Sequence, residues 1–235
     1  LKELMKQRQI ITKNETIAKE HNVEKVSSLL LWGVPGTGKT SAAMGIAKML
    51  EADFIRLDKE LFDSEFISRG PRQLSELFRN IKEYAKSNKN KNIVIFMDEI
   101  DSTIAIDKGL ESKQDEVLIN TLKQGLSDLQ AECDNVLFIG ATNKDPSGFK
   151  SDNKTVKLNS AILSRFNYQF EIGLPDISAI KDAWSKLIKT QSGKEKFTEK
   201  QNKLISEKFH ELGMSYRDIK NISNKLNIND AVEFC

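Results

Sequence analysis

The sequence of 235 residues contains only two cysteines, no long hydrophobic run and no large excess of either charge. Cys133 and Cys235 could pair in principle, but so few cysteines in a chain of this size favour free thiols in a reducing compartment. No apolar run approaches the ~20 residues that a membrane-spanning helix requires, and residues 1–4 lack the apolar core of a secretory signal. We therefore expect a cytoplasmic protein without a membrane segment in this chain.

The charged residues are numerous but balanced. The 36 basic and 34 acidic residues give a net charge of +2. Because both signs are mixed, the sequence lacks the concentrated basic face that binds nucleic acid, and a nucleic-acid partner is not indicated. Hydrophobic residues make up 39% of the chain and charged residues 30%, which is typical of a globular protein and excludes a disordered one.

Short apolar segments alternate with helical patterns over most of the sequence. The segment 93–97, Ile-Val-Ile-Phe-Met, is apolar on both faces, as a central parallel strand is. This alternation predicts a three-layer α/β domain in which helices cover both sides of a parallel sheet. The other strands are expected at residues 28–32, 54–57, 136–141 and 168–172, and the helices at 41–50, 74–84 and about 115–131.

Beyond Leu174-Pro175-Asp176 the strand patterns cease. Three helical patterns follow, at about 177–190, 198–212 and 215–227. We therefore predict an α/β domain over residues 1–174 and a small, separate α-helical domain over residues 177–235.

The strongest chemical signal is a Gly-x-x-x-x-Gly-Lys-Thr phosphate loop, the Walker A motif, which follows the strand at 28–32. Glycines let backbone N–H groups turn toward phosphate oxygens, the following helix offers its positive end, and the lysine adds a cation. The threonine hydroxyl can ligate Mg²⁺. The residues expected to contact ATP are Gly33, Val34, Pro35, Gly36, Thr37, Gly38, Lys39, Thr40 and Ser41.

Two acids directly follow the apolar segment 93–97, in the manner of a Walker B motif. A buried strand that delivers Asp98 and Glu99 at its carboxyl end brings them to the crevice where such sheets bind ligands. Asp98 is expected to hold Mg²⁺ together with Thr40, and Glu99 to polarise the attacking water. Acids are also common where helices start, so the two acids alone are weak evidence. They indicate a nucleotide site because the phosphate loop is present in the same chain.

With the phosphate loop and the two acids, the sequence resembles the AAA+ ATPase family over about residues 28–227. The strand that ends in Ala141-Thr142-Asn143 looks like the family's first sensor, which implies that Asn143 helps to orient the lytic water. The segment 158–166 resembles the stretch that ends in an arginine finger, which implies that Arg165 reaches the nucleotide of a neighbouring subunit, although an ordinary surface arginine is the alternative. The resemblance therefore implies a ring of identical chains, usually a hexamer.

Two further matches to the family are weaker. The segment 213–219 resembles the start of the last lid helix, where Arg217 could contact the nucleotide or form an ion pair on the helix surface. Phe66 and Ile67 stand where the family has a pore loop that grips a protein substrate, although two apolar residues packed in a helix would look the same. Ser68 stands where a glycine is usual. The helix at 115–120 also lacks arginines that many relatives carry there.

These observations predict an ATPase that uses ATP and Mg²⁺ and remodels or unfolds a protein threaded through a ring. The main alternative is a switch or loader that opens and closes on DNA or a partner complex without threading anything. A metabolic kinase is disfavoured, because the asparagine sensor and the arginine finger serve hydrolysis in a ring. The segment 66–70 distinguishes the threading machine from the switch or loader, since only a threading machine needs this segment in its channel.

Overall fold

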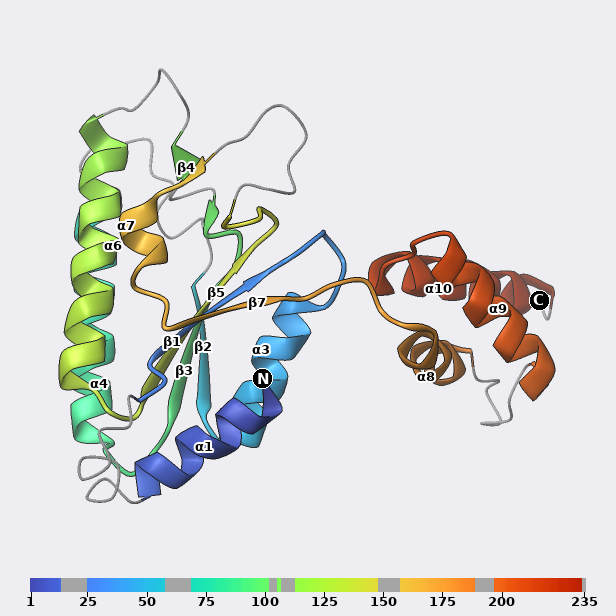
Figure 1. Cartoon of the computed structure of the whole chain (residues 1–235), viewed down its shortest axis with the longest axis horizontal. Coiled ribbons are helices and arrows are strands. Elements are labelled where there is room, and N and C mark those ends of the chain that lie inside the picture. Colours follow the sequence, from blue (N-terminus) through green and yellow to red (C-terminus); the bar gives the residue numbers. More distant parts are fainter. Residues whose placement is uncertain are drawn as a thin grey trace. The chain divides into compact units, whose positions relative to one another are not determined.

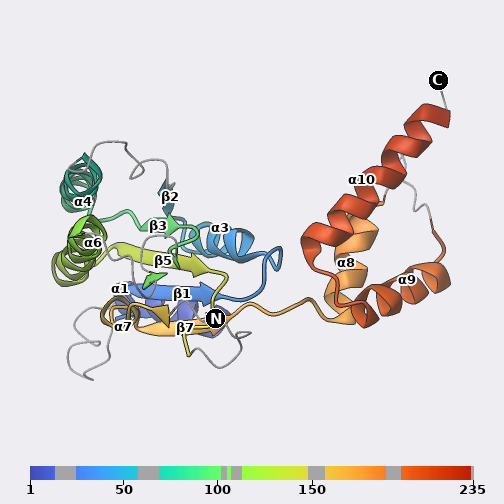
Figure 2. The ribbon, with the colours of Figure 1, turned by 90° about the horizontal axis from the view of Figure 1, so that it is seen from above.

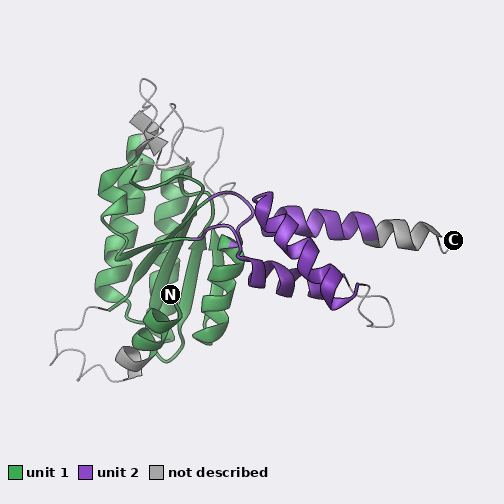
Figure 3. Cartoon of the chain, turned by 45° about the vertical axis from the view of Figure 1, so that its right-hand side comes forward, with its two compact units in different colours: residues 1–33, 39–171 green, residues 34–38, 172–235 purple. Residues whose placement is uncertain are grey.

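A computed structural model describes residues 1–13, 25–57, 69–101, 105–106, 113–147, 157–188 and 197–233. The chain divides into two compact units (Figure 3). The first unit contains residues 1–33 and 39–171, and the second contains residues 34–38 and 172–235. The phosphate loop is thus shared between the units, because its middle residues cluster with the C-terminal helices.

A five-stranded sheet with the order β2-β3-β5-β1-β7 forms the centre of the first unit, and all neighbouring strands are parallel. The interior strands β3 and β5 are buried along their whole length, and for β3 the apolar pattern of residues 93–97 predicts this. The strands are β1 (Ser28–Trp32), β2 (Asp53–Leu57), β3 (Ile93–Met97), β5 (Val136–Thr142) and β7 (Tyr168–Glu171).

Helices cover both faces of this sheet. Helices α4 (Arg69–Ser87) and α6 (Lys113–Glu132) lie side by side on one face, and α3 (Lys39–Met49) lies on the other (Figures 1 and 2). The main apolar core fills the space between the sheet and the α4–α6 pair. There the ring of Phe78 occupies the space that a side chain at Gly125 would need, so the two helices pack closely. The predicted parallel sheet between two helical layers is confirmed.

Three small elements of the first unit were not predicted from the sequence. Strands β4 (Ala105–Ile106) and β6 (Lys157–Leu158) pair antiparallel, and α7 (Ser160–Leu163) is a single turn of helix. Two-residue strands and one-turn helices are too short to show a periodicity. The turn of α7 is nevertheless well defined, because the side chain of Asn159 accepts a hydrogen bond of 3.0 Å from the Ala161 N–H.

The N-terminal helix α1 (Lys2–Lys13) is attached to the sheet by a buried arginine. Arg8 is 1% exposed, and its guanidinium donates hydrogen bonds to the carbonyl oxygens of Val26 and Val136, the latter at 2.9 Å. Burial lowers the pKa of Arg8 to about 10, so the side chain is still charged at neutral pH. The helix is thereby fixed at the amino-terminal edge of β1 and β5.

The second unit contains helices α8 (Ile177–Leu187), α9 (Glu199–Glu211) and α10 (Tyr216–Glu233). Trp184 lies at the centre of their core, with the ring of Phe209 edge-on at 5.1 Å between centroids. Helix α8 begins at the N-cap Asp176, and α9 begins at a capping box formed by Thr198 and Gln201. The predicted C-terminal helical bundle is confirmed. No helix within the described ranges is long and apolar enough to cross a membrane.

Candidate functional site

The carboxyl ends of three neighbouring strands bring several of the predicted site residues of the first unit together. Strand β1 leads into Gly33, β3 into Asp98 and β5 into Asn143. In the parallel register Trp32 pairs with Thr142, and the Gly33 N–H donates a hydrogen bond of 3.3 Å to the Thr142 carbonyl. The phosphate loop therefore starts beside the end of β5. This is the edge at which open parallel sheets bind ligands.

Lys39, the first residue of α3, is 7% exposed. Its ammonium group donates hydrogen bonds of 2.8 Å to the carbonyl oxygen of Gly33 and of 2.8 Å to the side-chain oxygen of Asn143. Both partners are neutral oxygens. The ammonium group of Lys39 is thus held at the sheet edge beside the start of the phosphate loop, where a cation is suited to binding an anion.

A hydroxyl and a carboxylate lie together beside this lysine. The Thr40 hydroxyl donates a hydrogen bond of 3.1 Å to Oδ2 of Asp98. The other carboxylate oxygen of Asp98, Oδ1, accepts a hydrogen bond of 3.0 Å from the Glu99 N–H. Oxygen ligands of this kind are those that Mg²⁺ prefers, commonly one or two from the protein with the remainder from phosphate and water. The donor set therefore fits a magnesium ion that arrives with a nucleotide.

Glu99 has a left-handed backbone, with φ of +48°. This conformation is uncommon for a residue with a side chain and is typically retained at functional sites. It turns the chain sharply after β3, and the next residue, Ile100, is buried and donates its N–H to the Ala141 carbonyl at 2.9 Å. The side chain of Glu99 is exposed. The turn thus presents a solvent-accessible carboxylate next to Asp98.

A second hydrogen bond between these strand ends was not predicted from the sequence. The buried hydroxyl of Thr142 donates to Oδ1 of Asp101 at 2.9 Å, and it accepts 3.0 Å from the Lys144 N–H. Thr142 precedes the predicted sensor Asn143, and Asp101 follows two residues after Glu99, but nothing in the spacing of Thr142 and Asp101 indicates that they pair. The contact fixes the acid-bearing turn relative to Asn143.

The middle of the phosphate loop belongs to the second unit. Gly36 and Gly38 have φ angles of +82° and +95°, which only glycine adopts without strain. The Arg217 N–H donates a hydrogen bond of 3.3 Å to the Gly36 carbonyl. A Cβ atom at Gly36 would lie 2.5 Å from the Ser215 hydroxyl. The N-terminus of α10 therefore packs directly on the loop, and only glycine leaves room for it.

Asp218 fixes this end of α10. Its Oδ2 accepts hydrogen bonds of 2.7 Å from the Ser215 hydroxyl and of 3.0 Å from the Ser215 N–H. These hydrogen bonds lower the pKa of Asp218. Arg217, which directly precedes Asp218, has an exposed side chain. Arg217 therefore contacts the loop through its backbone, which the sequence analysis did not anticipate.

Arg165 lies elsewhere in the first unit. Its side chain is exposed, while its carbonyl oxygen accepts 2.6 Å from the hydroxyl of Ser28 at the start of β1. The phosphate loop follows the opposite end of that strand, so Arg165 is not gathered with the other predicted residues. Ser41 in α3 is exposed, and Val34 and Pro35 in the phosphate loop are exposed as well. Phe66 and Ile67 lie outside the described residues.

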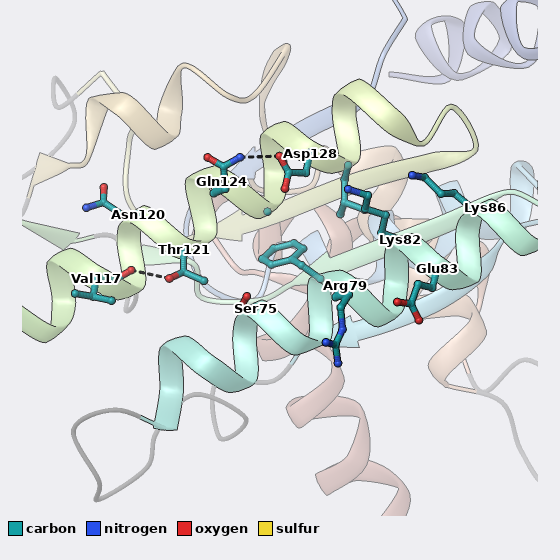
Figure 4. A pocket seen from close by; sticks show the side chains of 13 residues that line it. Ser75, Arg79, Lys82, Glu83, Lys86, Val117, Asn120, Thr121, Gln124 and Asp128 are labelled. Carbon is teal, nitrogen blue, oxygen red and sulfur yellow. Dashed lines mark hydrogen bonds between the residues drawn. The ribbon is translucent and has the colours of Figure 1, made fainter.

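A surface groove of about 740 Å³ lies between α4 and α6, lined by residues such as Arg79, Lys82 and Gln124 (Figure 4). None of the predicted site residues lines it. Lys82 donates a hydrogen bond to Glu132 beside the groove, so this charge is engaged in holding the two helices together. The groove is separate from the candidate nucleotide site.

Comparisons with known proteins show the family of this chain. Residues 29–174 match the AAA family, described as the ATPase family associated with various cellular activities. The match covers more than half of the chain, and the chain therefore belongs to the AAA ATPase family.

Similar curated proteins include two from different organisms. A proteasome-activating nucleotidase of Saccharolobus solfataricus is 32% identical over 251 residues, which cover 99% of this chain and 58% of that protein. Cell division protein C of Sulfolobus acidocaldarius is 30% identical over 155 residues, or 65% of this chain and 38% of that protein. The chain thus spans about half the length, or less, of these curated relatives.

A solved structure shares the fold. The crystal structure of the FIGL-1 AAA domain in complex with ADP superimposes with a TM-score of 0.70 at 21% sequence identity, over 96% of this chain and 70% of that chain. At this identity the likeness concerns the fold, which is the parallel five-stranded sheet with flanking helices and a C-terminal helical bundle.

Proposed function

We propose that this chain hydrolyses ATP to ADP and phosphate, with Mg²⁺, at the edge of the sheet where Lys39, Thr40, Asp98, Glu99 and Asn143 meet. The observation that carries the proposal is the pair of hydrogen bonds Lys39–Asn143 and Thr40–Asp98, of 2.8 and 3.1 Å. They join three segments that are far apart in the sequence, and each contributes a group that phosphoryl transfer requires.

The residues have distinct roles in this proposal. The buried charge of Lys39 attracts the phosphates, and the loop glycines expose N–H groups to them. Thr40 and Asp98 hold the magnesium ion, which when bound offsets negative charge on the phosphates. Glu99 acts as the base that polarises the attacking water, since its carboxylate is exposed beside Asp98. Asn143 orients that water.

We further propose that residues 1–174 are the nucleotide-binding domain and residues 177–235 a lid domain. The hydrogen bond from the Arg217 N–H to the Gly36 carbonyl supports a lid that senses the phosphate loop directly. Residues 34–38 belong to the same compact unit as the lid helices, whereas Gly33 and Lys39 belong to the first unit.

Arg165 serves a neighbouring subunit in this account. It is exposed and lies at the amino-terminal end of β1, whereas the chain's own phosphate loop follows the other end. An arginine finger supplied in trans raises phosphoryl-transfer rates by ~10³–10⁵. The active form is therefore a ring of identical subunits, and the resemblance to the family implies a hexamer.

The work that hydrolysis drives is the remodelling or unfolding of a protein. The similarity to proteasome-activating nucleotidases over nearly the whole chain supports this use. Phe66 and Ile67 are the residues that we propose grip the substrate.

The nucleotide-binding part of the proposal is tested by Lys39→Ala. Loss of the buried cation should weaken ATP binding by about 100-fold, because a charge-assisted hydrogen bond contributes up to ~3 kcal/mol. Lys48→Ala is the matched control, since Lys48 lies on the same helix and is exposed. Isothermal titration with ATP and Mg²⁺ gives both affinities. Equal affinity of the two variants would reject the site.

A further inference from the structure

The carbonyl oxygen of Arg165 is held by two side chains from different elements. The Ser28 hydroxyl in β1 lies 2.6 Å from it, and the Gln130 amide nitrogen in α6 lies 2.7 Å from it. The same amide nitrogen lies 3.0 Å from the Ser28 hydroxyl oxygen. Ser28 is fully buried, so the contact fixes Arg165 to the interior of the sheet.

Asn167 strengthens this attachment two residues further along the chain. Its side-chain oxygen accepts 3.0 Å from the N–H of Ser27 and 3.0 Å from the N–H of Ser28. Its own N–H donates to the Ser28 hydroxyl oxygen at 3.0 Å. The backbone on the C-terminal side of Arg165 is thus bound to Ser28, the first residue of β1, and to Ser27, the residue before it.

The residues next to Arg165 are fixed as well. Phe166 is buried, with its ring 6.0 Å from that of Phe138, and it fills the space above Gly140, where a Cβ would lie 2.9 Å from the ring. On the other side, the Arg165 N–H donates to the Ile162 carbonyl at 2.9 Å. Arg165 therefore has an exposed side chain on a backbone that is held from both directions.

Gln130 is not required to satisfy this carbonyl. Its hydrogen bond to Arg165 is exposed to solvent, where water can replace a lost donor at little cost in stability. Water cannot, however, hold the Arg165 backbone in a fixed position as the Gln130 side chain does. A finger that must reach a neighbouring active site depends on a backbone set to within a fraction of an ångström, and a 1 Å misplacement can cost ~10²-fold in rate.

We propose that Ser28 and Gln130 are positioning residues for Arg165, through which the strand that carries this subunit's own phosphate loop sets the finger offered to the next subunit. The inference rests on the proposed role of Arg165 in trans. Neither residue touches the nucleotide. Each acts by holding the Arg165 carbonyl, and through it the direction in which the side chain leaves the backbone.

Gln130→Met tests the proposal, because methionine keeps the length and approximate volume of the side chain but has no donor. Gln124→Met is the matched control, since Gln124 lies on the same helix and donates to Asp128 at 2.7 Å instead. We expect about a tenfold fall in kcat for Gln130→Met in the assembled protein. The ATP affinity and melting temperature should match those of Gln124→Met.

A double variant separates positioning from a general structural role. Once Arg165 is absent there is no finger to position, so Arg165→Ala with Gln130→Met should be no slower than Arg165→Ala alone. A further loss in the double variant, or wild-type kcat in Gln130→Met while Arg165→Ala is impaired, overturns the positioning role alone. Wild-type kcat in Arg165→Ala overturns the finger itself, and the positioning role with it.

Discussion

The ammonium group of Lys39 lies 2.8 Å from the side-chain oxygen of Asn143, and 104 residues separate the two in the sequence. The contact joins the start of α3 to the residue that follows β5. It also gives Asn143 a fixed orientation, because its oxygen faces the lysine and its amide nitrogen is left to donate elsewhere. A water molecule at the site is the acceptor that our proposal assigns to it.

Asn143→Ala should therefore retain nucleotide but hydrolyse it slowly. Removing a positioned donor from a site of this kind typically reduces kcat by ~10²-fold. The affinity for ATP should change only severalfold, since Lys39 keeps its bond to the Gly33 carbonyl. Steady-state ATPase assays with separate ATP titrations measure both quantities, and Asn120→Ala, on the exposed face of α6, serves as the control. A loss of binding as large as that of Lys39→Ala would show that Asn143 acts only as the lysine's partner.

Gly36→Ala should disable the phosphate loop without unfolding the protein. The left-handed φ of +82° is strained by a side chain, and the new Cβ meets Ser215 at 2.5 Å, so the loop and the start of α10 must separate. ATP affinity should fall at least about tenfold, as measured by titration.

Gly45→Ala is the control for this glycine substitution. Gly45 is in α3 and a Cβ there has no neighbour within 4 Å, so alanine should stabilise the helix by about 0.5–1 kcal/mol. Unchanged ATP binding in Gly36→Ala would mean that the loop does not contact α10 in solution in the way described.

Arg8→Ala should lower the free energy of unfolding by about 3 kcal/mol. The substitution leaves the carbonyl oxygens of Val26 and Val136 without their Arg8 donor, and each unsatisfied buried group typically costs ~1–3 kcal/mol. Lys6→Ala changes an exposed residue of the same helix and should have little effect. Denaturant unfolding of both variants provides the comparison. A difference below ~1 kcal/mol between them would show that α1 contributes little to the stability of the first unit.

Much of the fold was predictable because the relevant patterns are local. The strands 28–32 and 93–97 agree with the structure to the residue, since each is a short apolar run bounded by polar residues. Helix α10 extends to Glu233, beyond the predicted end at 227, because polar residues can continue a helix without an apolar periodicity to reveal it. The one-turn helix α7 has no period at all.

The site was predictable only where one continuous motif contains its residues. Glycine, lysine and threonine at fixed spacing identify the phosphate loop, and Asp98 follows from the apolar strand before it. The pairs Thr142–Asp101 and Gln130–Ser28 are 41 and 102 residues apart. Their meeting depends on strand order, which a single sequence does not encode locally. Buried Arg8 was missed for the same reason, because its carbonyl partners are distant in the chain.

The most direct test of the account is the turnover of Glu99→Gln, measured beside Glu51→Gln. Both glutamates are exposed and have left-handed backbones, with φ of +48° and +50°, so the pair controls for loss of charge at a strained position. Glutamine keeps the shape and hydrogen bonding but cannot act as a base. We predict that Glu99→Gln binds ATP with wild-type affinity and hydrolyses it ~10²–10⁴-fold more slowly, while Glu51→Gln turns over normally. Wild-type turnover in Glu99→Gln would contradict the proposed site.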